Sequence, residues 1–148
     1  MKKVIVLIAL LTAILIGCNK SGASDSLSWE ENLETALQKA KTENKAVLVN
    51  FTGSDWCQWC IKLSNEVFSK SEFEDYAKDN LILVRIDFPQ SIEQSAATKS
   101  YNTQLAQKFG IQGYPTILLF NSIGTLVLTT GYQPGGPVSY VEHLKNSL

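Results

Sequence analysis

The sequence predicts an α/β fold in which helices cover both faces of a mixed sheet. Two apolar runs, 46–51 and 81–87, lack the alternation of a half-exposed strand, as expected of strands covered on both faces. Residues 116–120 and 126–129 flank a short turn, which indicates an antiparallel hairpin. Segments with apolar residues at intervals of three and four separate these strands and predict helices. This order of elements favours three layers, α/β/α.

The bulk composition is that of one ordinary globular domain. The chain has 148 residues, of which 45% are hydrophobic and 18% charged, enough to bury a core of useful size. Its formal net charge is -1, and removal of Lys2 and Lys3 with a leader leaves 11 basic and 14 acidic residues, or -3. This charge gives no indication of nucleic-acid binding or of an electrostatic membrane patch.

The N-terminal residues have the pattern of an export signal. Lys2 and Lys3 precede the apolar run 4–16, which is shorter than a membrane-spanning helix needs. The residues 15–18, Leu-Ile-Gly-Cys, resemble the bacterial lipoprotein signal, in which cleavage before the Cys is coupled to its lipidation.

The sequence thus divides into three parts. We expect a signal peptide at 1–17, a lipidated Cys18 with a flexible tether at 18–27, and a folded domain at 28–148. The alternative for Cys18 is an ordinary secreted protein cut later, for example after Ala23.

Within the domain, the first predicted helix begins at a capping box. Ser28 and Glu31 have the spacing of such a box, and the apolar periodicity extends to a helix end near Asn44. After the strand 46–51, apolar residues from Ile61 onward predict a helix, and a second helical piece is expected after Ser71.

The second half of the domain follows the strand 81–87. A polar segment, Gln90 to Ser100, has no role that the sequence indicates, and it leads into a helix ended by Gly110. After the hairpin, the Pro-Gly-Gly-Pro run at 134–137 breaks the chain, and residues 138–148 form a closing amphipathic helix with His143 on its surface.

Two cysteines form the candidate redox site. Cys57 and Cys60 stand three positions apart, after a buried strand and before a predicted helix. At the first turn of a helix, free backbone amides and the helix dipole favour the Cys57 thiolate and lower its pKa. Cys60 lies one turn on and can close a disulfide, so the pair can attack a substrate disulfide and resolve the mixed disulfide.

Other readings of the two cysteines are weaker. A zinc site needs four ligands, and His143 and Cys18 are the only further candidates, so no metal is expected. Haem attachment needs His after the second Cys, where Ile61 stands. A purely structural disulfide across so short a loop would stabilise little.

Several motifs together resemble the thioredoxin family. These are the order of elements, the dithiol after the first core strand, and the run 109–120, Phe-Gly-Ile-Gln-Gly-Tyr-Pro-Thr-Ile-Leu-Leu-Phe. The similarity extends from Trp29 to Leu148. More narrowly, residues 51–62 resemble bacterial envelope disulfide reductases of the DsbH kind. The resemblance implies the thioredoxin fold, with a central mixed sheet.

The resemblance also implies roles for individual residues. Cys57 is the attacking thiol and Cys60 the resolving thiol. Pro115 matches the family's cis-proline, and the backbone of Tyr114 pairs with an extended substrate segment. Gly131, with the tyrosine after it, matches the third loop of the substrate groove.

Side chains beside the thiols are candidates for substrate contact. Trp56 and Trp59 can cover a partner's disulfide. Trp59 is expected to be exposed, whereas the sequence leaves Trp56 open between core and surface. Asp55 is expected to be a turn or cap residue rather than a group that tunes Cys57.

Two positions depart from the family pattern. Asn50 stands where thioredoxins have a buried acid that accepts the proton of the resolving Cys, and Asn cannot take that proton. Leu83 stands where the family has a nearby Lys. The sequence therefore predicts an apolar and uncharged underside of the dithiol.

These observations favour a thiol–disulfide oxidoreductase of the bacterial envelope that reduces protein disulfides without a cofactor beyond its own dithiol. The expected partners are disulfide-containing envelope proteins and a membrane thiol electron donor, with the protein a lipid-anchored monomer. The alternatives are a non-catalytic thioredoxin-fold adapter and a disulfide-introducing oxidase.

Overall fold

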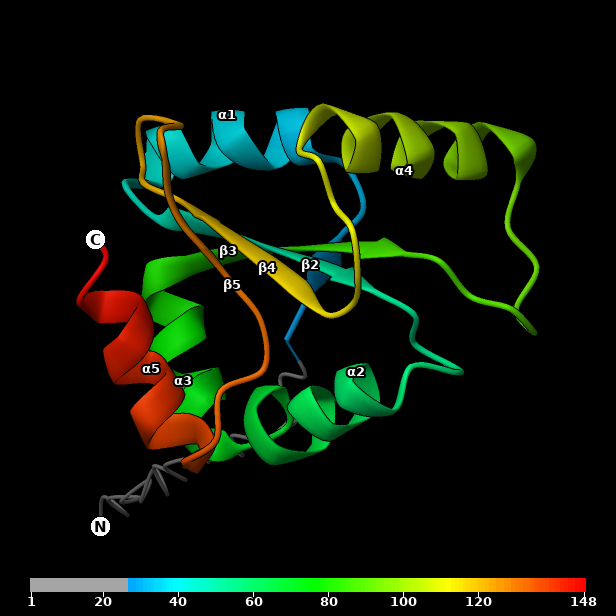
Figure 1. Ribbon diagram of the computed structural model, residues 1–148. Helices are drawn as coiled ribbons and strands as arrows, with labels where there is room; N and C mark the ends of the chain where they lie inside the picture. The colour runs from blue at the N-terminus through cyan, green and yellow to red at the C-terminus, as the bar shows by residue number, and fades with distance from the viewer. Residues whose placement is uncertain (1–26) are drawn as a thin grey trace, which may run out of the picture.

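A computed structural model describes residues 27–148 and contains one five-stranded sheet between two layers of helices (Figure 1). The strand order is β1-β3-β2-β4-β5. Strands β1 and β2 both run parallel to β3, whereas β4 runs antiparallel to β2 and to β5, so the sheet is mixed. The strands are β1 (Trp29–Glu30), β2 (Ala46–Thr52), β3 (Leu81–Asp87), β4 (Thr116–Phe120) and β5 (Leu126–Thr130).

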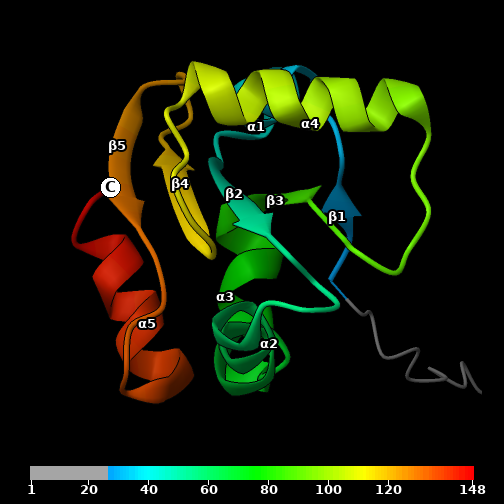
Figure 2. The ribbon, with the colours of Figure 1, turned by 45° about the vertical axis from the view of Figure 1, so that its right-hand side comes forward.

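The helices divide between the two faces of the sheet. Figures 1 and 2 show α1 and α4 on one face, and α2, α3 and α5 on the other. This arrangement confirms the predicted three-layer α/β/α fold. The helices are α1 (Leu33–Glu43), α2 (Gln58–Leu63), the π-helix η1 (Ser64–Phe68), α3 (Ser71–Asn80), α4 (Ala96–Lys108) and α5 (Gly136–Lys145).

The central strand β2 is covered on both faces, as its unbroken apolar run predicted. All seven of its residues are buried, and neighbouring side chains belong to opposite layers of the core. Leu48 packs in the cluster beneath the sheet with α3 and α5, whereas Val49 packs in the cluster under α1 and α4. The strand is therefore held in place by both layers, and its end is a fixed point for the residues that follow.

The predicted hairpin of β4 and β5 is confirmed, and its turn explains the polar residues between the strands. The Asn121 side-chain oxygen accepts hydrogen bonds from the backbone amides of Ile123 and Thr125, at 3.3 and 2.9 Å. Gly124 has a φ of 85°, a left-handed conformation that glycine adopts without strain.

The predicted start of the first helix is wrong. Trp29 and Glu30 form β1 instead, because Leu83 and Val84 of β3 offer backbone groups for pairing at that edge of the sheet. The Trp29 ring then packs 5.3 Å from Phe68, centroid to centroid. Helix α1 begins four residues later than a Ser28 cap would place it.

The observed cap of α1 is Asn32, whose side-chain oxygen accepts the Thr35 amide at 2.7 Å. The predicted helix end at Asn44 is confirmed, since this residue is the C-cap and adopts the left-handed conformation. Helix α5 begins at Gly136, inside the run that was expected to lie before it, because Pro137 is tolerated in a first helical turn.

The predicted signal peptide 1–17, Cys18 and most of the tether lie outside the described residues. Within residues 27–148, no helix combines the length and apolar character needed to cross a membrane.

Candidate redox site

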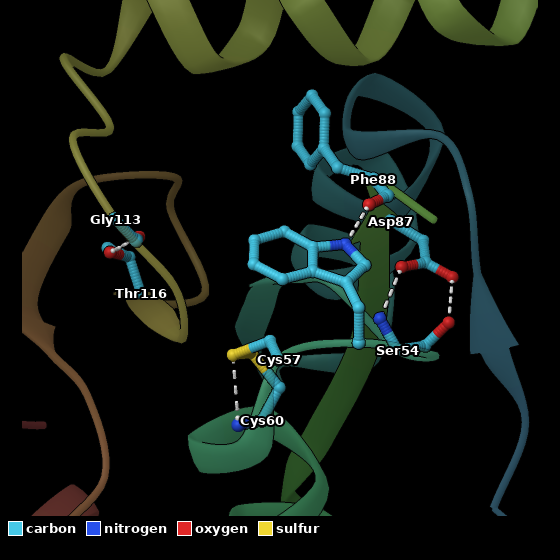
Figure 3. Close-up of a disulfide and its surroundings, with 8 residues drawn as sticks. Ser54, Cys57, Cys60, Asp87, Phe88, Gly113 and Thr116 are labelled. Atoms are coloured by element: carbon cyan, nitrogen blue, oxygen red, sulfur yellow. Dashed lines mark hydrogen bonds between the residues drawn. A yellow bond between two sulfur atoms is a disulfide. The ribbon is translucent and has the colours of Figure 1, made fainter. Parts of the chain in front are cut away.

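The two cysteines lie where the end of β2 turns into α2, and they are joined by a disulfide. Their Cα atoms are 5.2 Å apart. Cys57 is the N-cap of α2, and its Sγ accepts a hydrogen bond from the Cys60 backbone amide at 3.2 Å (Figure 3). A free amide of the first helical turn therefore points at the sulfur that was predicted to attack.

The helix that begins at Cys57 is longer than α2 alone. The π-helix η1 follows α2 without a break, so the helical segment runs from Gln58 to Phe68. The amides at its start and the dipole of its aligned peptides favour negative charge on Cys57 in the reduced protein. In the disulfide form Cys57 and Cys60 are 7% and 5% exposed, so only a partner that fits closely reaches the sulfurs.

The turn before Cys57 requires a glycine. The Cys57 amide donates to the Gly53 carbonyl at 2.9 Å, which closes the turn. A Cβ atom on Gly53 would lie 2.5 Å from the Trp56 indole. Gly53 therefore permits the position of Trp56 beside the disulfide.

Aromatic side chains stand on both sides of the dithiol. Trp56 is 41% exposed, which answers the question that the sequence left open, and its indole N–H donates to the Phe88 carbonyl at 2.7 Å. Trp59 is 56% exposed, as predicted, and its ring lies 5.3 Å from that of Tyr132. The Lys62 ammonium is within 5.2 Å of both of these ring centroids.

The three loops that the resemblance assigned to the substrate groove meet beside the disulfide. The Tyr114–Pro115 bond is cis, as the resemblance implied. The Tyr114 ring lies edge-on to Trp56, with centroids 6.0 Å apart. A Cβ atom on Gly131 would lie 3.0 Å from the Pro115 carbonyl oxygen, so the third loop approaches the proline closely.

The polar segment after β3 is fastened to the dithiol turn. The Asp55 carboxylate accepts the backbone amides of Gln90 and Ser91, at distances down to 2.6 Å. Ser54 donates to Asp87 through both its amide and its hydroxyl (Figure 3). The first part of the segment Gln90 to Ser100 therefore lies beside the active-site turn. Its last residues form the start of α4.

The prediction of an apolar, uncharged underside is wrong. Asn50 is buried as expected and Leu83 lies in the core, but the register of β2 and β3 places Arg85 opposite Asn50. Both side chains line a cavity of about 390 Å³ that also reaches Cys60. The alternation of side chains along a strand could have identified Arg85 from the sequence, because residues two apart, such as Leu83 and Arg85, share a face of the sheet.

His143 takes no part in this site. It lies on α5, half-buried, with its Nε2 atom 3.1 Å from the Thr130 hydroxyl oxygen. Within residues 27–148, no three His, Cys, Asp or Glu side chains are grouped as a metal site requires.

Comparison with known proteins identifies the family. A family model described as a thioredoxin-like domain matches residues 33–140. The chain belongs to the thioredoxin-like family. The disulfide-linked pair at the start of α2 is thus the redox-active pair of a thiol–disulfide oxidoreductase.

Individual proteins show a more specific similarity than the family model does. The disulfide bond reductase DsbH of Chlamydia pneumoniae is 35% identical over 126 residues, which cover 85% of this chain and 75% of that protein. The thioredoxin-related protein DsbJ of the same organism is 29% identical over 80% of this chain and 36% of its own. A solved structure named DsbH oxidoreductase has a TM-score of 0.77, with 34% identity over 83% of this chain and 85% of its own.

The contact between Asp55 and the 90–91 backbone predicts that the stability of this loop contact depends on pH. Hydrogen bonds from the Gln90 and Ser91 amides lower the pKa of Asp55 below its ordinary value of 3.8. The folded protein therefore gains this stabilisation above pH 3.8 and loses it as the pH falls through the lowered value. Amide hydrogen exchange of Gln90 and Ser91, followed by NMR, should be roughly fivefold faster at pH 6 in Asp55→Ala than in the wild type.

Asp55→Asn is the matched control, because it keeps an acceptor oxygen but cannot titrate. It should retain most of the protection of Gln90 and Ser91, without the loss at acid pH. Equal exchange in Asp55→Ala and the wild type at pH 6 would show that the carboxylate does not hold the loop.

Proposed function

We propose that this protein reduces protein disulfides through its Cys57–Cys60 dithiol. The observation that carries the proposal is the position of Cys57 Sγ at the N-cap of α2, hydrogen-bonded to the Cys60 amide and bonded to the Cys60 sulfur. The direction of the reaction is supported by the relative named as a disulfide bond reductase.

The reaction follows from this geometry in two exchanges. The Cys57 thiolate attacks one sulfur of the substrate disulfide, and the other substrate sulfur leaves as a thiolate. Cys60 then loses its proton and attacks Cys57, which releases the first substrate sulfur and forms the Cys57–Cys60 disulfide. Two electrons pass from the dithiol to the substrate, and no other cofactor takes part.

The substrate contacts come from the residues around the disulfide. The exposed rings of Trp56 and Trp59 offer apolar area to a segment that carries a disulfide. An extended substrate segment pairs with the backbone at Tyr114, between Pro115 and the Gly131 loop. The Cys57–Cys60 disulfide is then reduced again by a membrane protein that transfers thiol electrons, and the protein acts as a monomer.

The N-terminal sequence supports an envelope location. The charged start, the short apolar run and the Leu-Ile-Gly-Cys residues at 15–18 support cleavage before Cys18 and attachment of lipid to its thiol. The protein then works at the outer side of the cytoplasmic membrane or elsewhere in the envelope, where disulfides form.

A turbidity assay of insulin reduction with a chemical thiol donor tests the catalytic proposal. The wild type should turn over, whereas Cys57→Ser should fall to the background rate, because no attacking thiol remains. Cys60→Ser should also lose turnover but accumulate the mixed disulfide, which non-reducing gel electrophoresis detects. Equal activity of the wild type and Cys57→Ser would favour a binding adapter instead.

The equilibrium of the same dithiol with glutathione buffers gives the direction. A reductase should have a potential near that of thioredoxin, about -270 mV. A value near about -120 mV, typical of a disulfide-introducing enzyme, would contradict the assignment as a reductase.

Lipid attachment is tested by growth with a fatty-acid analogue that can be labelled. The wild type should carry the label and sediment with membranes, and Cys18→Ser should do neither. Absence of label from the wild type would mean that the protein is an ordinary secreted one. Cys57→Ser is the matched control, since it removes a thiol without touching the signal.

A further inference from the structure

A cavity with both polar and apolar lining residues reaches Cys60. It has a volume of about 390 Å³ and is lined in part by Asn50, Thr52, Ser54, Cys60, Ser64 and Arg85. These residues come from the end of β2 and the turn after it, from α2 and η1, and from β3. The residue that carries the resolving sulfur therefore borders a space that polar side chains also line.

The buried side chain of Asn50 indicates that this space holds water. Asn50 is only 9% exposed, and within residues 27–148 no protein group donates to its Oδ1 atom. A buried carbonyl without a partner is costly, and the cavity greatly exceeds the roughly 10–15 Å³ that one water needs. A half-turn of the amide exchanges its oxygen and nitrogen, so Asn50 can present either an acceptor or a donor to the cavity.

Arg85 lines the same cavity and carries a permanent positive charge. It stands opposite Asn50 in the register of β2 and β3. Among the described residues, no carboxylate lies within 4.0 Å of its guanidinium group. A cation that is not neutralised by a close acid favours a thiolate nearby.

Acids on the elements around Cys60 could also take its proton. Of the four acids on α3 only Glu74 lines the cavity, and η1 and β3 contribute Glu66 and Asp87. Glu74 of α3 lines the cavity, and Asp87 of β3 is occupied by two hydrogen bonds from Ser54. Glu66 of η1 accepts a hydrogen bond from Tyr132 and lies 3.9 Å from the Lys62 ammonium. Glu74 is therefore the one acid of these three that could compete with water for the Cys60 proton.

We propose that this cavity is the exit for the Cys60 proton, with Asn50 holding the water that accepts it and Arg85 stabilising the thiolate that remains. The inference rests on the proposed function and deepens it. Cys60 gives its proton to cavity water, and its thiolate attacks Cys57 of the mixed disulfide. The Cys57–Cys60 bond forms, the bond from Cys57 to the substrate breaks, and the substrate leaves as a thiolate. Asn50 and Arg85 are thus positioning residues that replace a buried acid.

Stopped-flow reaction of the reduced protein with Ellman's reagent separates the two exchanges. Attack by Cys57 releases one coloured thiolate at a rate that depends on reagent concentration. Resolution by Cys60 releases the second at a rate that does not. Asn50→Leu removes the amide and puts apolar atoms in its place on the cavity wall, so it should slow the second release by about tenfold or more while leaving the first unchanged. Asn50→Ser is the matched control, because it keeps the cavity polar and should stay close to the wild type.

The charge of Arg85 is tested through the pH profile of the second release. Loss of a cation disfavours the Cys60 thiolate, so Arg85→Gln should move the midpoint to higher pH by roughly half a unit or more. Lys99→Gln removes the same charge from the exposed surface of α4, outside the cavity, and should leave the midpoint in place. Arg85 is itself exposed, so its variant decides the question if Asn50→Leu does not fold.

The outcomes separate this inference from the proposed function. Absence of the first release would refute the reactive dithiol, and with it the proposed function. The cavity route alone would be overturned if the first release is normal, Asn50→Leu leaves the rate of the second release unchanged, and Arg85→Gln leaves its pH midpoint unchanged. Glu74→Gln should leave the second release nearly unchanged. If it slows that release and Asn50→Leu does not, the carboxylate is the acceptor and the proposal is wrong.

Discussion

The hydrogen bond from the Cys60 amide to Cys57 Sγ is the interaction on which the site depends. It exists because Cys57 occupies the N-cap of α2, where the backbone has amides with no carbonyl partner within the helix. A sulfur in that position is favoured as a thiolate and is also within reach of its partner one turn on. The same geometry therefore provides both the attacking group and the means of releasing it.

The rest of the fold holds this position from several sides. Both layers of the core bury β2, so the strand that leads into the turn cannot shift. Ser54 and Asp55 fasten the turn to the end of β3 and to the segment after it. The aromatic pairs of Trp56 with Tyr114 and of Trp59 with Tyr132 then leave a narrow approach to a nearly buried disulfide. For the proposed reductase, we expect this restriction to select partners whose disulfide lies on an accessible, extended segment.

Features set by local pattern could be predicted from the sequence, whereas features set by strand pairing could not. The unbroken apolar run of β2 and the spacing of Cys57 and Cys60 predicted the strand, the turn and the disulfide pair. Trp29 was placed on a helix because its periodicity fits one, yet the open edge of β3 pairs with it as a strand. The alternation of side chains along β3 could have placed Arg85 on the same face as Leu83, but its position opposite Asn50 depends on the register of β2 and β3.

The most direct test of the account is the pH dependence of alkylation at Cys57, measured with iodoacetamide in reduced Cys60→Ser. The variant keeps the backbone amide at position 60 and leaves Cys57 as the only thiol of the dithiol. The account predicts a midpoint well below the value of about 8.5 for an ordinary cysteine. A midpoint at or above that value would contradict it, because the start of α2 would then give the sulfur no stabilisation as a thiolate.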